Sequence, residues 1–261
     1  MRFNVAIPAR YASTRLPGKV LRPIAGRPML QHVHDRAVAS GAARVVIATD
    51  DERIRRAAES FGATVCMTSA QHPSGSDRLA EMIETLEWAD DEIVVNLQGD
   101  EPLMPPTLIR QVAEDLDGHP EADIATAASP IRSAEELFNP HVTKVVMDAR
   151  GYALYFSRAP IPWERDVFTD SRQRLSPHVP HLRHIGLYAY RAVYLKRYAR
   201  LPPCELEQAE ALEQLRALWN GTHIHVCLAC ETPGPGVDTQ DDLARVEQAL
   251  AQGGFPGALT T

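Results

Sequence analysis

Several features are scarce in this chain of 261 residues, and each scarcity weighs against a class of protein. The four cysteines are scattered, which suits a reducing cytosol better than a disulfide framework. No stretch approaches the ~20 apolar residues of a membrane span, and the apolar run at residues 5–8 is far too short for a signal peptide. Basic residues form no run, and 27 Lys and Arg stand against 34 Asp and Glu, a net charge of −7. We therefore expect a soluble cytoplasmic protein that binds neither nucleic acid nor membranes.

The composition that is present is that of an ordinary globular protein, with 44% hydrophobic and 23% charged residues. Up to about residue 130, short apolar runs alternate with helical patterns, which is typical of βαβ units. The expected strands are residues 3–8, 44–49, 63–67, 92–98 and 123–128. The expected helices between them include residues 29–40, 51–61, a segment after the capping residue Ser74, and about 105–116. Because crossovers between parallel strands are right-handed, the pattern predicts a doubly wound α/β fold with a mostly parallel sheet.

The second half of the chain has a different rhythm. Residues 144–148 and 152–157 flank Ala-Arg-Gly and predict a hairpin, and residues 160–180, rich in Pro, Ser and charge, predict a mobile excursion. Residues 206–219 predict one strong helix, 223–229 a strand and 239–248 a last helix. The tail after residue 253 is expected to fray.

A loop at residues 8–19, PARYASTRLPGK, directly follows the first strand, at the sheet edge where open α/β folds bind ligands. Its small residues Ala9 and Ser13 let backbone N–H groups approach a ligand, and Arg10, Arg15 and Lys19 concentrate positive charge. Polyphosphate binding requires this combination. The loop is neither a Walker A motif nor G-x-G-x-x-G, and a basic solvated loop is the alternative.

Two aspartates stand where a metal ion is expected. Asp100 follows the strand at residues 92–98 on the same sheet edge, and a carboxylate facing a phosphate loop is well placed to hold Mg²⁺. Asp238, in the segment PGVDT, is either a second ligand or the N-cap of the last helix. For Asp100, a simple Gly-Asp turn is the alternative.

Eight segments together carry a resemblance to a known family over nearly the whole chain. They are PARYASTRLPGK (8–19), SGSDRLAE (74–81), VNLQGDEP (95–102), FNP (138–140), GYALYFSRAPIPWERD (151–166), RHIGLYAYR (183–191), LEQLRALW (212–219) and PGVDT (235–239). The chain resembles the 3-deoxy-D-manno-octulosonate (Kdo) cytidylyltransferases, also called CMP-Kdo synthetases. The resemblance implies a nucleotidyltransferase-type fold, a homodimer, and Mg²⁺-dependent coupling of CTP to Kdo with release of pyrophosphate for lipopolysaccharide assembly.

The resemblance also implies roles for individual residues. It places Arg10, Lys19 and Asp100 in catalysis, and Asp100 and Asp238 on Mg²⁺. The implied nucleotide-binding residues are Ala9, Arg10, Ser13, Arg15, Lys19, Arg78 and Gln98. Gln98 is left open between base and sugar, and for Arg78 a surface salt bridge to Glu81 or Glu84 is the alternative. No side chain stands out as a dedicated general base.

The acceptor sugar is a carboxylic acid, for which a bidentate arginine is the natural partner. Arg158 and Arg165 bracket the turn that the resemblance places over the sugar. His184 and Tyr188 share a face of a strand-like run, and Glu210 and Gln214 share a face of the predicted helix at 206–219. The resemblance makes these six residues the implied sugar site, with a polar strand face and an exposed helix face as alternatives.

The resemblance implies one domain over 1–261, with a CTP-binding half at 1–130 and a sugar-binding and dimerisation subregion at about 131–230. Leu215, Trp219 and the 144–157 hairpin are candidates for the dimer interface or for domain core. His223, His225 and Cys227 alternate onto one strand face, which can bind a stray metal, whereas Cys227 and Cys230 fit core packing better than a metal motif.

Three rival functions remain. The acceptor can be 8-amino-Kdo or sialic acid instead of Kdo, or the chain can be a nucleotide-binding sensor without catalysis. The presence of both Asp100 and Asp238 favours an enzyme.

Overall fold

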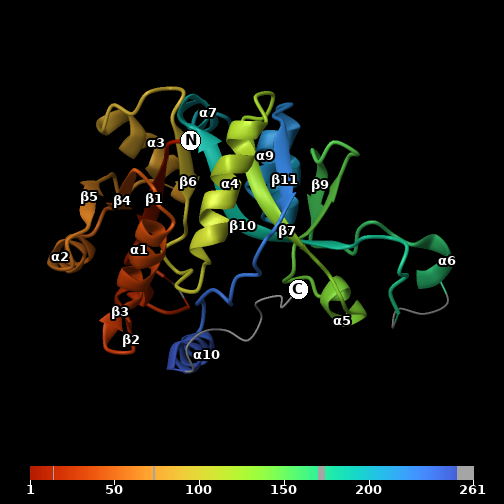
Figure 1. The fold of residues 1–261 in the computed structure, drawn as a ribbon, viewed down its shortest axis with the longest axis horizontal. Helices are drawn as coiled ribbons and strands as arrows, with labels where there is room; N and C mark the ends of the chain where they lie inside the picture. Colours follow the sequence, from red (N-terminus) through yellow and green to blue (C-terminus); the bar gives the residue numbers. More distant parts are fainter. Residues whose placement is uncertain (14, 73, 170–173, 252–261) are drawn as a thin grey trace.

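The computed structural model describes residues 1–13, 15–72, 74–169 and 174–251. Over these residues the chain builds one nine-stranded mixed sheet with helices on both faces, and a separate two-stranded sheet (Figure 1). The strand order is β11-β7-β10-β6-β1-β4-β5, and β8 pairs with β10 and with β9. The strands are β1 (Phe3–Ala9), β2 (Pro23–Ile24), β3 (Arg27–Pro28), β4 (Arg44–Thr49), β5 (Thr64–Met67), β6 (Ile93–Asn96), β7 (Ile124–Pro130), β8 (Lys144–Met147), β9 (Ala153–Ser157), β10 (Leu182–Arg191) and β11 (Ile224–Leu228).

The helices are α1 (Met29–Ala39), α2 (Glu52–Ser60), α3 (Gly75–Thr85), α4 (Pro106–Gly118), α5 (Ala134–Phe138), α6 (Arg165–Phe168), α7 (Ala192–Tyr198), α8 (Glu205–Glu210), α9 (Gln214–Trp219) and α10 (Gln240–Ala251), with a 3₁₀ turn at Lys19–Leu21. None of the described helices combines the length and the apolar character that crossing a membrane requires.

Four neighbouring strands of the sheet, β6-β1-β4-β5, are parallel, as the alternating pattern predicts. β1 pairs in parallel with β4 and β6, and β4 with β5, whereas β10 runs antiparallel between β6 and β7. Every residue of β1 is buried, because helices cover both sides of the strand. Val5 and Ile7 belong to the core cluster that includes α1, α2, α4 and α10, and Ala6 belongs to the cluster that includes α3, α7 and α9. The doubly wound α/β fold is confirmed.

The predicted hairpin is confirmed: β8 and β9 are antiparallel and turn at Gly151, whose φ of 89° favours glycine. The helix predicted over residues 206–219 is wrong as one element. Ala211 adopts a left-handed conformation (φ 52°) and separates α8 from α9. Within the predicted excursion, α6 buries Phe168 against Ile131 and Leu137. Residues 170–173 of that excursion and the tail from residue 253 lie outside the described residues.

Candidate active site

Two adjoining cavities meet near the edge of the sheet where β1 and β6 end, and the smaller one extends from there along β10. The larger has a volume of about 650 Å³ and is lined by Ala9, Arg10, Ser13, Arg15, Lys19, Arg78, Gln98, Asp100 and Asp238, among others. These are all the residues predicted from the sequence for nucleotide and metal binding. The smaller, of about 350 Å³, shares Ser76, Gln98 and Glu213 with the larger. Both volumes fall in the range of ligand sites.

Lys19 is the centre of the larger cavity. Its ammonium donates to the carboxylates of Asp100 (2.5 Å) and Asp238 (3.0 Å) and to the carbonyl of Val237 (3.1 Å). Burial acts to lower the pKa of Lys19, but the two carboxylates outweigh it and raise that pKa above its usual value. The two aspartates therefore converge on one cationic position, with Lys19 fully protonated between them.

The carboxylate of Asp238 is directed into this cavity. The alternative that Asp238 caps the last helix is wrong: the Thr239 hydroxyl accepts from the Asp242 amide (3.2 Å), and the Asp242 carboxylate accepts from the amides of Asp238 and Thr239. A backbone bond from Val237 N–H to Asp100 C=O (2.9 Å) then holds the segment of Asp238 against that of Asp100. Asp238 is consequently left to pair with Lys19 and with Arg15 (2.9 Å).

Close backbone packing brings these segments together. A Cβ at Gly99 would lie 3.0 Å from the Pro8 carbonyl, and a Cβ at Gly236 would lie 2.7 Å from the Glu101 carboxylate. Burial, together with the neighbouring Asp100, raises the pKa of Glu101 to about 8. Glu101 lines neither cavity, and its carboxylate lies against Gly236 behind Asp100.

The basic loop supplies one free and one paired arginine. Arg10 is exposed and lines the cavity, and across the described chain it forms no ion pair with a carboxylate. Ser13 accepts a long bond from the Leu16 amide (3.4 Å). Gly18 turns the loop with a φ of 67° and lies so close to Tyr11 that a Cβ would be 3.0 Å from its ring. The loop is thereby folded over the end of β1.

Arg78 is turned inward from the start of α3. It is 4% exposed, donates to the Thr68 hydroxyl (2.5 Å) and lies 3.3 Å from the Asp50 carboxylate. The alternative of a surface salt bridge to Glu81 or Glu84 is therefore wrong. The Ser74 side chain accepts from the Asp77 amide, so the predicted cap starts α3 and sets Arg78 on the cavity wall.

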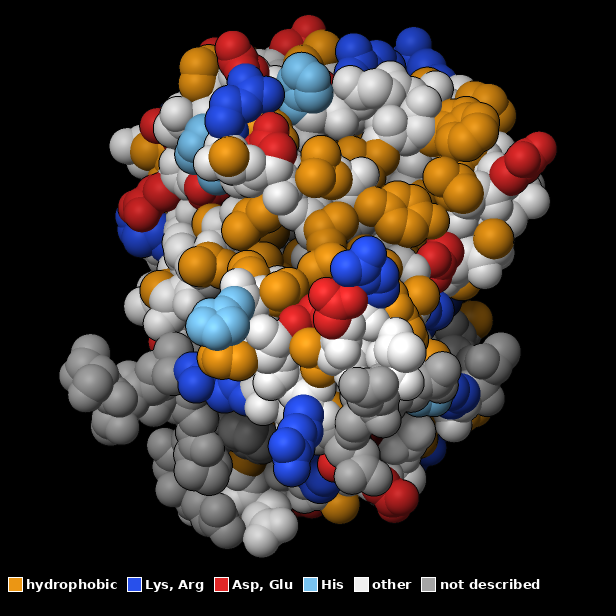
Figure 2. All heavy atoms as spheres, turned by 90° about the vertical axis from the view of Figure 1, so that its right-hand side faces the viewer, with side chains coloured by type: hydrophobic (Ala, Val, Ile, Leu, Met, Phe, Trp, Pro, Cys, Tyr) orange, Lys and Arg blue, Asp and Glu red, His pale blue; other side chains and the backbone are white. Residues whose placement is uncertain are grey.

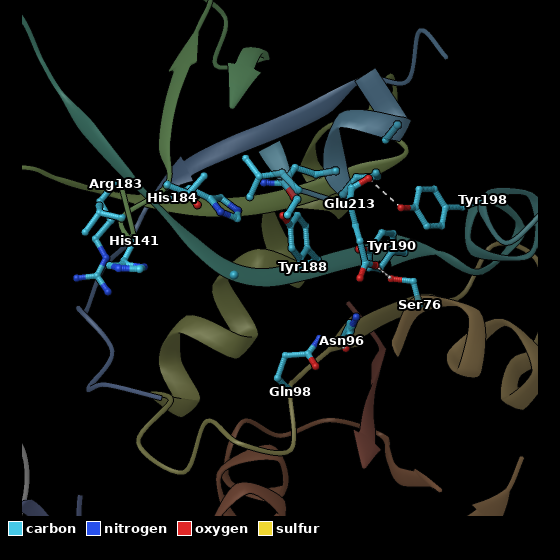
Figure 3. A pocket seen from close by; sticks show the side chains of 18 residues that line it. Ser76, Asn96, Gln98, His141, Arg183, His184, Tyr188, Tyr190, Tyr198 and Glu213 are labelled. Atoms are coloured by element: carbon cyan, nitrogen blue, oxygen red, sulfur yellow. Dashed lines mark hydrogen bonds between the residues drawn. The ribbon is translucent and has the colours of Figure 1, made fainter. Parts of the chain in front are cut away.

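The smaller cavity is lined by aromatic and polar side chains from β10, α9 and the loop before β8. Figure 3 shows Arg183, His141 and His184 at one end, and Tyr190, Ser76 and Glu213 at the other, with Gln98 and Asn96 across from Tyr188. Burial raises the pKa of Tyr188 and of Tyr190, so both hydroxyls stay protonated and can donate. Such a lining suits a compact, hydroxyl-rich ligand.

His184 and Tyr188 share this wall, as predicted, with ring centroids 5.3 Å apart. A register shift of β10 between Ile185 and Tyr188 accompanies this contact. His184 Nε2 lies 3.0 Å from the hydroxyl of Thr126, which lies 2.8 Å from the Leu187 carbonyl. Burial lowers the pKa of His184 to about 3, and the Arg183 charge acts in the same direction, so the ring is neutral.

Three of the predicted sugar-binding residues line neither cavity. The Arg158 guanidinium donates to the carbonyls of Glu210 (2.7 Å) and Pro140 (3.1 Å), and Arg165 pairs with Asp166 in an exposed position. Glu210 accepts from Ser157 Oγ (2.5 Å) and from the Arg158 amide (2.9 Å), so it ties the end of α8 to β9.

The predicted shared face of Glu210 and Gln214 is wrong, because the break at Ala211 separates their helices. Gln214 alone of the two lines the smaller cavity.

Sequence reasoning missed the arginine of this cavity. Arg183 stands next to His184 in β10, and strand alternation assigns it to the opposite face, yet it lines the cavity and lies 3.7 Å from Glu136. Ser76 and Glu213 were also missed. Ser76 stands inside the segment SGSDR, and Glu213 directly precedes Gln214, so both adjoin predicted residues.

Comparisons with known proteins identify the family of this chain. A family model described as cytidylyltransferase matches residues 5–224. The 3-deoxy-manno-octulosonate cytidylyltransferase of Coxiella burnetii is 57% identical over 246 residues, covering 94% of this chain and 98% of that protein. The protein of the same name from Thioalkalivibrio sulfidiphilus is 58% identical over 250 residues, covering 96% and 99%. The chain belongs to the 3-deoxy-manno-octulosonate cytidylyltransferase family.

Solved structures agree with membership of this cytidylyltransferase family. A CMP:2-keto-3-deoxy-manno-octonic acid synthetase complexed with CTP superposes with a TM-score of 0.88 and 42% identity, covering 97% of this chain and 100% of that chain. A nucleotidyl transferase from Methanothermobacter thermautotroptrophicus, at 15% identity and a TM-score of 0.59, shares the fold alone. The family and the fold predicted from the eight segments are confirmed, and the enzyme is a nucleotidyltransferase.

Proposed function

We propose that this cytidylyltransferase transfers CMP from CTP to the 2-hydroxyl of Kdo, releases pyrophosphate, and supplies CMP-Kdo for lipopolysaccharide assembly. The observation that carries the proposal is the junction of two unlike cavities at one sheet edge. The larger combines a basic loop with two aspartates and suits a nucleoside triphosphate. The smaller suits a sugar acid, and the relatives named above support Kdo as that acid.

Arg10, Arg15 and Lys19 receive the triphosphate in this proposal. A sugar acid and a triphosphate repel each other, so catalysis consists mainly of neutralising charge and holding both substrates in line. Arg10 is exposed at the cavity wall, and Arg15 and Lys19 already face the aspartates that a bound cation would engage. We infer that Arg78 and the start of α3 contact the cytosine, because Arg78 lines the cavity from the first turn of that helix.

Asp100 and Asp238 fit a magnesium site. Their oxygens are the donors that Mg²⁺ prefers, and they already converge on one cation, the Lys19 ammonium. When bound, Mg²⁺ supplies neutralisation of phosphate charge and makes an attacking hydroxyl easier to deprotonate. Asp100 and Asp238 would hold the ion, and Lys19 would be free to contact phosphate oxygens. This arrangement needs no side chain as a dedicated base.

Arg183 is the cation we propose for the sugar carboxylate, since it lines the smaller cavity, whereas Arg158 and Arg165 do not. His184, Tyr188 and Gln214 offer hydrogen bonds to sugar hydroxyls. Ser76, Gln98 and Glu213 line both cavities, so the sugar hydroxyl and the α-phosphate meet beside them. The sugar hydroxyl then attacks the α-phosphorus where the two cavities meet.

We also infer that the enzyme is a cytoplasmic homodimer. Hydrophobic side chains gather on the upper half of the face toward β9, which is the right-hand side of Figure 1 (Figure 2). Leu154 on β9 is 63% exposed and Trp219 on α9 is 58% exposed, and contiguous exposed apolar patches mark interaction surfaces, whereas Leu215 is buried in the core. Sedimentation equilibrium of wild type and Leu154→Glu tests the inference, and an unchanged mass would remove this face from the interface.

Pyrophosphate release tests the proposed reaction. Purified protein is given CTP, Mg²⁺ and Kdo, and Kdo is replaced in turn by 8-amino-Kdo and sialic acid, and CTP by UTP. Release with CTP and Kdo is the expected result. Release with another sugar acid alone would overturn the acceptor. Silence with every acceptor, despite measurable CTP binding, would favour a nucleotide-binding sensor.

A further inference from the structure

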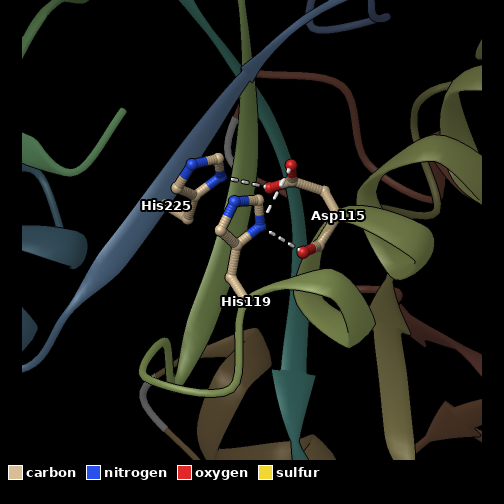
Figure 4. A group of neighbouring side chains, drawn as sticks. All are labelled: Asp115, His119 and His225. Atoms are coloured by element: carbon tan, nitrogen blue, oxygen red, sulfur yellow. Dashed lines mark hydrogen bonds and ion pairs between the residues drawn. The ribbon is translucent and has the colours of Figure 1, made fainter. Parts of the chain in front are cut away.

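A cluster of metal-ligating side chains lies outside the two cavities, and none of its three residues lines either of them. Asp115 and His119 stand one turn apart at the end of α4, and His225 stands near the start of β11 (Figure 4). β11 runs parallel to β7, and His225 pairs with Ala125 near the amino ends of both strands, whereas Asp100 follows the carboxyl end of β6. The cluster is thus separate from Asp100 and Asp238.

The three side chains converge. One ligand atom from each residue lies within 4.8 Å of the other two. His225 Nδ1 is 2.6 Å from one Asp115 carboxylate oxygen, and His119 Nδ1 is 3.6 Å from the other. The two imidazole rings stack with centroids 3.5 Å apart, and His119 Nδ1 also lies 2.7 Å from the Asp115 backbone carbonyl, so binding of an ion requires the His119 ring to turn away from that carbonyl. Two imidazoles and one carboxylate are a donor set for borderline divalent ions such as Zn²⁺ and Co²⁺.

The other nitrogen of His225 supports this interpretation. His225 Nε2 lies 3.2 Å from the Arg150 carbonyl, and a backbone carbonyl on the second ring nitrogen is the usual partner of a metal-bound histidine. Gly151 permits this approach, since a Cβ there would lie 2.6 Å from His225 Nε2. Tyr152 packs edge-on against both rings, at 6.4 Å from His119 and 5.2 Å from His225. The ring of His225 is therefore fixed with Nδ1 toward Asp115.

We propose that Asp115, His119 and His225 bind one borderline divalent metal ion, which joins α4, β11 and the β8–β9 hairpin. His225 is buried, whereas the His119 side chain is 36% exposed and leaves a path for the ion. The sequence pattern instead places His223, His225 and Cys227 together as candidate metal ligands on one strand face. In the structure His225 meets Asp115 of α4 and His119, the residue that follows α4, and the His223 ring nitrogen lies beside the Glu121 carbonyl (3.2 Å).

Co²⁺ binding, followed by visible absorption, tests the proposal without an activity readout. Chelator-treated enzyme is titrated with Co²⁺ in excess Mg²⁺, and Zn²⁺ is then added as competitor. We expect one Co²⁺ per chain with ligand-field bands that Zn²⁺ abolishes. His119→Gln should weaken Co²⁺ binding by roughly tenfold or more. His223→Gln, a neighbouring histidine outside the cluster, should leave the binding unchanged.

Further variants keep the test decisive. Asp115→Asn repeats the ligand test if circular dichroism shows that His119→Gln is unfolded, and it should weaken binding likewise. Asp100→Asn should retain the Co²⁺ spectrum. Loss of the spectrum in Asp100→Asn would place the ion in the larger cavity, and a thiolate charge-transfer band would indicate Cys227. Either of these two results would overturn the proposal. So would equal Co²⁺ affinity in wild type, His119→Gln and Asp115→Asn, and so would an absence of Co²⁺ bands in wild type.

Discussion

Lys19 Nζ donates a 3.0 Å hydrogen bond to the carboxylate of Asp238, although 219 residues separate the two in the chain. The same ammonium bonds to Asp100, which follows β6. The start of the chain, its middle and its end thus meet at one cation. In our proposal, this is the position where Mg²⁺ would take the place of the lysine ammonium when a triphosphate brings its own negative charge.

Replacement of Asp100 by Asn should reduce turnover by roughly a hundredfold or more and leave the fold intact. The substitution keeps the side-chain volume but removes a charge that we assign to Mg²⁺, and it also leaves Lys19 with one carboxylate partner. Steady-state pyrophosphate release and circular dichroism measure the two effects. Asp241→Asn, at an exposed position of α10, is the matched control. Near-normal activity of Asp100→Asn would contradict the metal assignment.

Lys19→Met should raise KM for CTP by ~10- to 100-fold. A hydrogen bond to a charged group contributes about 1.5–3 kcal/mol, and its loss weakens binding by roughly that factor. Methionine keeps most of the aliphatic stem in place and removes the ammonium that faces the triphosphate in our proposal. KM for Kdo should change much less. Kinetics with each substrate varied in turn distinguish the two, and unchanged CTP kinetics would remove Lys19 from the triphosphate site.

Arg183→Met should raise KM for the sugar acid by a similar ~10- to 100-fold and spare KM for CTP. Arg165→Met is the matched control, since Arg165 is exposed and lines neither cavity. The sequence predicts the opposite ranking, with Arg158 and Arg165 on the carboxylate. A larger effect of Arg165→Met than of Arg183→Met would therefore restore the sequence prediction.

Glu210→Ala should lower the free energy of unfolding by about 1–3 kcal/mol, because it leaves Ser157 Oγ and the Arg158 amide without their partner. Urea denaturation measures this loss. We expect KM for the sugar acid to stay within a few-fold of wild type, since Glu210 lines neither cavity. The reverse pattern, a large change in KM with unaltered stability, would identify Glu210 as a sugar ligand.

The stability of the enzyme should fall in acid partly through His184. Its folded pKa of about 3 lies below the ordinary value of 6.5, so the unfolded chain takes up a proton that the folded chain refuses. The stabilisation is fully present above pH 6.5 and is lost as the pH falls from there toward 3. Between about pH 6 and 4, wild type should lose at most about 1.4 kcal/mol per pH unit more than His184→Gln. Parallel urea midpoints in the two proteins would contradict a buried neutral His184.

Much of the fold and of the larger cavity follows from local sequence signals. The loop of Arg10 to Lys19 and the turn of Asp100 each end a buried strand, and the ends of parallel strands share one sheet edge, so their meeting was predictable. The smaller cavity was not. Ala211 adopts a left-handed conformation although it is not a glycine, so nothing in the sequence marks the break. The apolar periodicity predicts one continuous helix there, whereas the break separates Glu210 from Gln214. The strand pattern near Arg183 also does not predict the register shift of β10 between Ile185 and Tyr188.

The phosphorus NMR spectrum of the enzyme with CTP, Mg²⁺ and Kdo tests the central claim most directly, since it follows every phosphate group at once. We predict that the triphosphate signals disappear while pyrophosphate and one new phosphodiester, CMP-Kdo, grow in equal amounts, and that a chelator stops all three changes. Conversion of CTP to pyrophosphate and free CMP without the phosphodiester would contradict transfer to Kdo. An unchanged triphosphate spectrum, at concentrations where CTP binds, would contradict catalysis altogether.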